Sequence, residues 1–432
     1  MLTLRFNSLA CKKFLQLSGC QGIGTPSLKS VIQHKFHSFG SRCQLSKPGT
    51  QLNSTSKFSL GKRLQTTAAI RIEKAVVKPA NHKAVGYWLL GCSGMVFGAV
   101  ILGGVTRLTE SGLSMVTWRL LGEKLPITES EWKAEFAKYQ QYPEFKMKNQ
   151  SITLEEFKWI WWMEYGHRMW GRLIGASFYM PATFFWAKGW LTPVMKKRVA
   201  FFGALIAAQG LMGWYMVKSG LEDRFDGPSD VPRVSQYRLA SHLSLAFILY
   251  SLLLSSSLDV LLPAQKVDLA TITKLSTRFR MLAHSCKGMV FLTALSGAFV
   301  AGLDAGLVYN SFPLMGNGLI PSDILSMKPA ITNFTENPTT VQFDHRILGT
   351  TTLCLISGMW LLSRKRTLPA RAYKAATAMA TMAWMQVALG ISTLVMYVPV
   401  SLAAAHQSGS LVLLSLAVWL SHELKHVKRV VK

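Results

Sequence analysis

Residues 164–175 read EYGHRMWGRLIG, and residues 342–349 read QFDHRILG. In both stretches a His-Arg pair opens an apolar run and is followed by a glycine, Gly171 or Gly349. Each run extends for about 20 residues, which is enough to cross a bilayer as a helix. Because an ionisable side chain is costly inside a membrane, its recurrence at the same place in two spans indicates a duplicated unit with a function.

Three further matches occur in the same order along the chain. They pair Gly98-Ala99-x-x-x-Gly103 with Gly297-Ala298-x-x-x-Gly302, Gln209-x-x-x-Gly213 with Gln386-x-x-x-Gly390, and Ala240-x-His242-x-Ser244 with Ala404-x-His406-x-Ser408. Small residues at helical spacing let helices approach closely in lipid, so we assign the glycines to packing seams. A repeat with an even number of spans enters the membrane from the same side each time, which predicts pseudo-two-fold symmetry along the membrane normal.

The chain contains eight such apolar segments, and we predict an all-α membrane protein built as two tandem four-helix bundles. The predicted transmembrane spans are 85–105, 167–188, 199–217, 238–262, 281–303, 344–363, 373–398 and 402–421. The N-terminal half then covers 85–262 and the C-terminal half 281–425, with a leading segment 66–84, a linker 263–280 and a basic tail 426–432.

The net charge of +27 over 432 residues suggests nucleic-acid binding until the charges are placed on the chain. Much of the excess lies in the leader and in short loops, and no basic face with interleaved aromatic residues occurs, so we exclude nucleic acid. Residues 1–65 contain ten Lys or Arg, ten Ser and no acid, which is typical of a mitochondrial transit peptide. The cysteines form no C-x-x-C motif, so the pattern indicates neither a disulfide framework nor a cysteine zinc site.

Basic residues also orient the spans. The links after the second, fourth and sixth spans, and the tail, are rich in Lys and Arg, whereas the opposite loops are mixed or acidic. By the positive-inside rule both termini face the matrix. We therefore expect a multi-pass protein of the mitochondrial inner membrane.

Each even-numbered span carries one histidine near its start: His167, His242, His345 and His406. The even spans run in one direction, so we expect the four imidazoles at similar depth near the intermembrane-space face. Zinc would want further ligands close by. Two imidazoles facing each other across a gap suit the axial positions of a heme iron. We predict two hemes, one for each half of the chain.

Arginines accompany these histidines. Arg168 and Arg346 each follow the first histidine of a pair, and Arg107 ends the first span at the same membrane face. A guanidinium group can hold a carboxylate through two hydrogen bonds, so we predict that these arginines bind heme propionates. Interfacial anchoring is the alternative reading of any single one.

The two halves differ three residues before the first histidine, where Glu164 corresponds to Gln342. A carboxylate beside a heme can accept a proton or stabilise positive charge on the ring edge, which makes Glu164 a candidate catalytic residue. Favourable placement of a negative charge near a helix N-terminus explains it equally well. The asymmetry predicts a reaction site in the first half and an electron-holding site in the second. The remaining histidines, which we expect to be solvated or interfacial, are His34, His37, His82, His284, His422 and His426.

The sequence resembles the heme A synthase family, in its mitochondrial form, from about residue 83 to 425. The resemblance is carried by E-x-x-H-R at 164–168, GGVTRLTESGLS at 103–114, AGLDAG at 301–306, NSFPLM at 310–315, and the pair His345 and His406. One bacterial type of this family carries a cysteine pair in an outer loop. This chain has no cysteine in its loops beyond the leader except near span ends, so it resembles the type without that pair, and we exclude a disulfide-relay mechanism.

The resemblance implies oxidation of the C8 methyl group of heme O to a formyl group, by two hydroxylations and loss of water, giving heme A for cytochrome c oxidase. It further implies that His167 and His242 flank the substrate heme O with Glu164 at the reacting edge, while His345 and His406 ligate a heme b cofactor. Ferredoxin, reduced by ferredoxin reductase, is the implied electron donor on the matrix side. Heme O synthase, cytochrome c oxidase assembly factors and a second copy of the chain are further implied partners within the lipid bilayer.

Two other functions remain open on the residues alone. A diheme b-type electron carrier would bind the same cofactors without reacting on them, but familiar carriers place two histidines on each of two helices. A repeat-built transporter would show broken helices and polar residues at mid-membrane, and these spans show little of either.

Overall fold

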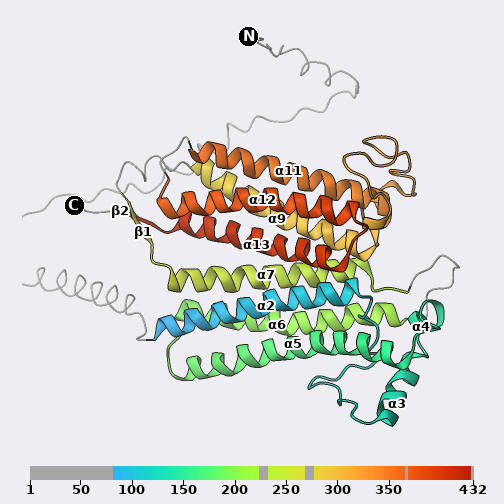
Figure 1. Cartoon of the computed structure of the whole chain (residues 1–432). Coiled ribbons are helices and arrows are strands. Elements are labelled where there is room, and N and C mark those ends of the chain that lie inside the picture. Colours follow the sequence, from blue (N-terminus) through green and yellow to red (C-terminus); the bar gives the residue numbers. More distant parts are fainter. Residues whose placement is uncertain (1–80, 223–231, 268–276, 365–367, 430–432) are drawn as a thin grey trace, which may run out of the picture. The chain divides into compact units, whose positions relative to one another are not determined.

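The computed structural model describes residues 81–222, 232–267, 277–364 and 368–429. Within them, the long helices run alongside one another (Figure 1). These are α2 (His82–Leu108), α5 (Leu154–Ala187), α6 (Pro193–Leu221), α7 (Gln236–Leu261), α9 (Thr277–Gly302), α11 (Pro338–Arg364), α12 (Ala370–Val395) and α13 (Val400–Lys425). The predicted transit peptide 1–65, most of the segment 66–84, and parts of the linker and tail lie outside the described residues.

Seven of these helices are long and apolar enough to cross a membrane. The exception is α5, which carries Arg168 and Arg172 inside the predicted span as well as Glu155, Glu156 and Lys158 before it. The all-α membrane fold is therefore confirmed. The count of eight spans and the pseudo-two-fold axis stay predictions.

Helix α5 begins 13 residues before the predicted span. Thr153 and Glu156 form a capping box at its N-terminus: the Thr153 side chain accepts from the Glu156 N–H, and the Glu156 carboxylate accepts from the Thr153 N–H. Such a cap contributes about 1 kcal/mol to helix stability. His167 consequently lies more than three turns inside α5, where the sequence analysis placed it at the helix start.

The segment between α2 and α5, residues 109–153, is here called the cap segment. It contains α3 (Glu129–Tyr139) and α4 (Pro143–Met147). Met115, Trp132 and Tyr139 of this segment are buried against Phe157 and Trp161 of α5. The cap segment therefore has a small hydrophobic core of its own, built on the extended N-terminal end of α5. A shorter connection, with η1 (Ala305–Leu307), η2 (Ala330–Thr332) and α10 (Asn333–Glu336), joins α9 to α11.

Two short strands lie at the opposite end of the helices from α3 and α4 (Figure 1). Strand β1 (Gln265–Val267) pairs in parallel with β2 (Val427–Arg429), in a register that places Gln265 opposite Val427. The pairing ties the predicted linker to the predicted tail. From the sequence, these segments were predicted as a linker and a basic tail, and the two strands were not predicted.

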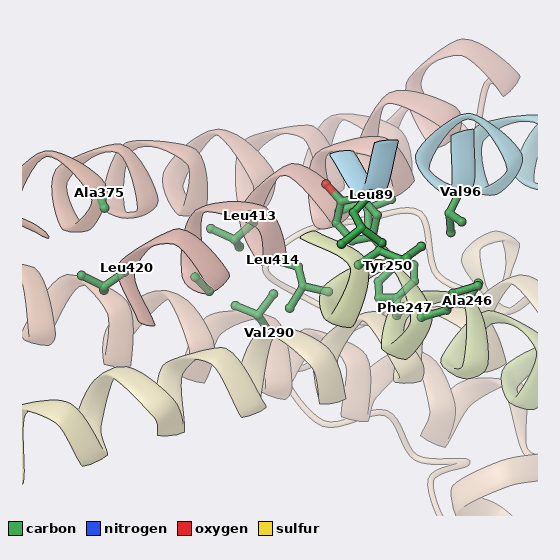
Figure 2. Packing of buried hydrophobic residues seen from close by; sticks show 14 of the residues in the cluster. Leu89, Val96, Ala246, Phe247, Tyr250, Val290, Ala375, Leu413, Leu414 and Leu420 are labelled. Atoms are coloured by element: carbon green, nitrogen blue, oxygen red, sulfur yellow. The ribbon is translucent and has the colours of Figure 1, made fainter. Parts of the chain in front are cut away.

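Four helices meet along the middle of the bundle: α2 and α7 from the first half, and α9 and α13 from the second. Figure 2 shows the apolar side chains that pack there, among them Phe247, Val290 and Leu414. Polar contacts cross the same interface, since the Tyr250 hydroxyl lies 2.7 Å from Ser415 Oγ. The histidine-bearing helices α7 and α13 are thus held against each other.

Candidate functional site

A single cavity of about 1030 Å³ lies among the long helices and is lined by all four intramembrane histidines. They reach it from α5, α7, α11 and α13. Pockets for drug-sized ligands measure roughly 300–1,000 Å³, so this cavity is at the upper end of that range. The four predicted ligands are therefore brought together on one continuous space.

Each histidine ring is seated against a glycine of the preceding long helix. The pairs are Gly103 with His167, Gly213 with His242, Gly297 with His345, and Gly390 with His406. A Cβ atom added at these glycines would lie 2.8, 3.1, 3.2 and 2.8 Å from the nearest ring atom, respectively. Any larger residue would push the ring away, so these glycines hold the imidazoles close to the helix backbone. The sequence analysis had read them as seams between helices only.

These contacts correct the register of the repeat. The sequence comparison equated Gly98 with Gly297, but it is Gly103 that holds the same place beside a histidine as Gly297 does. In the corrected register Glu110 corresponds to Asp304, and both have left-handed backbone conformations, with φ of 54° and 53°. The earlier match failed because glycines recur along α2, Gly98, Gly103 and Gly104 among them, so a Gly-Ala pair alone does not fix the register.

The ring nitrogens fit a heme iron. His345 and His406 lie with ring centroids 6.3 Å apart and planes at 87°, and His242 is close enough to His167 to interact with it electrostatically. In the described part of the chain, Nε2 of all four rings makes no hydrogen bond. An imidazole binds a metal through a ring nitrogen that carries a lone pair and no other partner, so four such rings suit two axial pairs.

The Nδ1 atoms differ between the halves. His345 Nδ1 lies 2.7 Å from Ser296 Oγ, and His406 Nδ1 lies 3.2 Å from Gln386 Nε2. His167 Nδ1 and His242 Nδ1 are buried without a hydrogen-bond partner among the described residues. Only the C-terminal pair of ligands is therefore fixed from behind.

Glu164 lines the same cavity as His167 but is directed largely toward the cap segment. Its Oε2 accepts hydrogen bonds from Ser114 Oγ at 2.8 Å and from Met115 N at 2.7 Å, while Oε1 pairs with Arg168 at 2.6 Å. Arg168 also donates to the Met115 carbonyl. This predicted catalytic carboxylate thus fastens the cap segment to α5, a role that the sequence did not suggest.

Gln342 occupies the same place on α11 with the opposite hydrogen-bonding sense. Its Nε2 donates to the carbonyl oxygens of Ala305 at 2.9 Å and Tyr309 at 3.1 Å. Arg346 donates to the Tyr309 carbonyl and to Gln342 Oε1. Each half therefore uses an amide or carboxylate and the adjacent arginine to hold the loop that follows its first helix.

Arg107 is paired within the protein. Its Nη2 lies 2.7 Å from Asp304 Oδ1, and Arg233 lies 3.5 Å from the other oxygen of Asp304. Nevertheless Arg107 lines the cavity, and its Nε is buried without a partner in the described part of the chain; Arg346 Nε is left in the same way. Both guanidinium groups retain a donor for a further acceptor.

Glu144 of the cap segment is a cavity-lining carboxyl group that the sequence analysis missed. It is 5% exposed, and its Oε2 accepts from the Tyr139 hydroxyl at 3.0 Å. Asn149 Nδ2 donates in turn to the Tyr139 oxygen at 2.8 Å. Burial is the main reason that the pKa of Glu144 is raised to about 8. No motif marks this residue, because its burial depends on how the cap segment folds.

The expectation for His422 was wrong. It is 4% exposed, where a solvated or interfacial side chain was predicted. It lies 3.4 Å from Asp259 Oδ1, and His426 Nε2 lies 2.9 Å from the same oxygen. Arg198 and Lys425 also approach Asp259, at 2.9 and 3.8 Å. With two fixed cations around one carboxylate, this cluster joins the helix ends electrostatically.

Comparison with known proteins gives one consistent result. Residues 86–418 match the family COX15-CtaA, described as cytochrome oxidase assembly protein. Heme A synthase COX15 of Bos taurus is 58% identical over 351 residues, which cover 81% of this chain and 84% of that protein. The human protein of the same name is also 58% identical, covering 81% and 85%. A heme A synthase of the bacterium Nitrosospira multiformis is 43% identical over 354 residues, covering 82% and 97%.

Proposed function

This chain belongs to the COX15-CtaA family and is a mitochondrial heme A synthase, and we propose that it makes heme A by oxidising the C8 methyl group of heme O to a formyl group. Two hydroxylations would each replace a C–H bond by C–OH on the same carbon. Each removes two electrons from the carbon, and dioxygen, reduced together with electrons from ferredoxin, would accept them. Loss of water from the resulting geminal diol leaves the formyl group. The protein is a multi-pass membrane protein, as its apolar helices and mitochondrial relatives indicate.

One observation carries the proposal: four histidines from four helices, each seated on a glycine, line one cavity with Nε2 atoms that have no hydrogen-bond partner among the described residues. That arrangement provides two bis-imidazole sites. A synthase needs both a site for the heme being changed and a site for the heme that stays. The unequal surroundings of the two pairs support this division.

In the first half, His167 and His242 would hold heme O. Glu164 would act on the reacting edge. Its negative charge would stabilise positive charge that develops on the methyl carbon, and its carboxylate would accept a proton. The hydrogen bonds from Ser114, Met115 and Arg168 support this role, because they fix the position of the carboxylate beside the cavity. The same bonds couple the carboxylate to the cap segment above it.

In the second half, His345 and His406 would ligate heme b, which supplies a one-electron relay when bound. Arg346 and Arg107, each with an unpartnered buried Nε, are the arginines best placed to bind propionates. Arg168 donates three hydrogen bonds within the protein, to the carbonyl oxygens of Thr117 and Met115 and to the Glu164 carboxylate. Its guanidinium group has five N–H donors and these bonds use three, so we propose that Arg168 binds a propionate through the remaining ones.

The remaining proposals concern partners and orientation. Electrons would come from ferredoxin and its reductase on the matrix side, with both termini in the matrix. Heme O synthase, cytochrome c oxidase assembly factors and a second copy of the chain are proposed neighbours in the membrane. The basic links between spans support this orientation.

The deciding experiment is extraction and chromatography of the hemes bound to the purified full-length protein. Heme B together with heme O or heme A supports the synthase with two sites. Heme B alone would favour the diheme carrier over a reaction on the heme itself. A double variant, His345→Ala with His406→Ala, should lose heme B and its low-spin spectrum; an unchanged spectrum would refute the C-terminal assignment.

A further inference from the structure

The first histidine of each pair differs in what lies behind it. Ser296 Oγ of α9 lies 2.7 Å from His345 Nδ1. The corresponding nitrogen of His167 is buried and has no hydrogen-bond partner in the described part of the chain. The two rings are otherwise presented alike, because each lies against a glycine of the preceding long helix.

The difference can be traced to one position in the repeat. Ser296 directly precedes Gly297, and Leu102 directly precedes Gly103. Since those two glycines seat the two rings, the serine and the leucine are equivalent. One half therefore has a hydroxyl group at this position, and the other half has a hydrocarbon side chain that forms no hydrogen bond.

The direction of the hydrogen bond follows from a second contact. Ser296 Oγ is also 2.7 Å from the Thr293 carbonyl oxygen, which can only accept. A hydroxyl has one proton, so Ser296 donates to Thr293 and accepts from the Nδ1–H of His345. With its proton on Nδ1, His345 keeps the lone pair on Nε2, the nitrogen that is unpaired at the cavity.

The second histidines share a backbone contact, although only His406 has an Nδ1 neighbour in the described part of the chain, Gln386 Nε2 at 3.2 Å. Gln209 Nε2 donates to the His242 carbonyl at 2.9 Å, and Gln386 Nε2 donates to the His406 carbonyl at 2.6 Å. Because both halves share this contact, it cannot separate their roles. The serine-for-leucine difference is specific to the first histidine of each pair.

We propose that Ser296 is the positioning residue that makes the C-terminal heme a resident one, and that Leu102 leaves the N-terminal heme free to exchange. The inference rests on the proposed function. A partner on Nδ1 fixes the ring and its tautomer and raises the basicity of the metal-binding nitrogen. A cofactor site gains from that restraint, whereas a site that must accept heme O and release heme A would be slowed by it.

The test uses the full-length protein purified in detergent with its bound hemes. Two readouts apart from synthase activity are the rate at which heme B passes to excess apomyoglobin and the midpoint potential of that heme. The variants are Ser296→Ala, the conservative Ser296→Thr, and the reciprocal Leu102→Ser. Transfer of heme O and heme A to apomyoglobin is followed in the same samples.

Loss of such a partner typically weakens metal binding 10- to 100-fold, so Ser296→Ala should release heme B about 10–100 times faster and should raise its midpoint potential. Ser296→Thr should stay close to the parent. Leu102→Ser should slow the release of heme O and heme A and leave heme B unchanged. A Ser296→Ala protein with the parent's release rate and potential overturns the inference.

Two further outcomes keep the test decisive. If Ser296→Ala does not fold, Leu102→Ser decides alone, and unchanged or faster release from the first site contradicts the inference. If the parent protein itself holds no heme B, the proposed function fails. If the parent and Ser296→Ala both hold heme B and release it equally fast, only the inference about Ser296 fails.

Discussion

Glu164 and Arg168 form an ion pair of 2.6 Å one turn apart on α5, with side chains 3% and 10% exposed. The other carboxylate oxygen receives the hydroxyl of Ser114 and the backbone N–H of Met115. A buried ion pair is costly unless its remaining hydrogen bonds are satisfied, and here they are. One carboxylate therefore combines a position on the cavity with the attachment of the cap segment.

Replacement of this carboxylate separates its two tasks. We expect Glu164→Gln to lower heme A formation by about 100-fold or more while heme O remains bound, because the amide keeps an acceptor oxygen but loses the negative charge. Ser114→Ala is the matched control, since it removes one hydrogen bond from Glu164 and leaves the charge. Chromatography of extracted hemes measures both variants, and normal heme A output from Glu164→Gln contradicts its role.

The glycine seats predict a steric effect on heme binding. Gly390→Ala places a Cβ atom 2.8 Å from His406 Cε1, so the ring must move away from the position that faces His345. We expect this variant to lose most of the low-spin heme b absorbance. Gly358→Ala, on α11, meets no atom within 4 Å and should retain it. Equal spectra in the two variants would show that the seat does not position the ring.

The roles of Arg107 and Asp304 can be separated by mutation, although the two residues form one ion pair. Half-exposed pairs contribute about 1 kcal/mol or less, so Asp304→Asn should change thermal stability little and heme content not at all. Arg107→Gln should additionally speed the loss of heme, because the free Nε of Arg107 is a donor to a propionate. Heme transfer to apomyoglobin measures the difference, and identical behaviour of the two variants would limit Arg107 to the ion pair.

Glu144 predicts a pH-dependent cap segment. Its pKa is raised from 4.5 to about 8 by burial and by the charges of Glu164 and Glu110, which oppose the effects of Tyr139 and Lys148. Between these values the folded chain holds a proton that the unfolded chain lacks, so stability falls as pH rises, until Glu144 ionises near 8. Hydrogen exchange of α4 amides should therefore accelerate from pH 6 to about 8.

Glu144→Gln supplies the control for that experiment. The amide keeps the size of the side chain and an acceptor for the Tyr139 hydroxyl, but it does not titrate. After correction for the intrinsic pH dependence of exchange, the variant should show a flat profile. A profile that is the same in both proteins would assign the effect to another group.

The sequence predicted the helices and the four histidines because both signals are local. Apolar runs of sufficient length mark spans, and an ionisable residue inside a span is conspicuous. The start of α5 at Leu154 was missed, although Thr153 and Glu156 form a recognisable capping box. The predicted span was bounded by hydropathy alone, and hydropathy does not show that the helix continues into a charged segment.

Contacts between distant segments could not be read in the same way. Arg107 and Asp304 form an ion pair although they are 197 positions apart, and neither of the two local motifs predicts the partner. Alignment of the two repeats correctly paired Glu164 with Gln342 as equivalent positions. It could not show that both side chains reach loops, because that depends on the paths of those loops over the helix ends.

Because one cavity is lined by all four histidines, the two proposed heme sites depend on each other when the enzyme is assembled. If His345 and His406 receive their heme first, the bound macrocycle becomes part of the wall against which the second heme is fitted. The heme b cofactor would then shape the binding site of the substrate heme as well as transfer electrons to it. A chain that lacks the first heme would be left with a compartment of the wrong shape, and so would be inactive even with every residue of its reaction site intact.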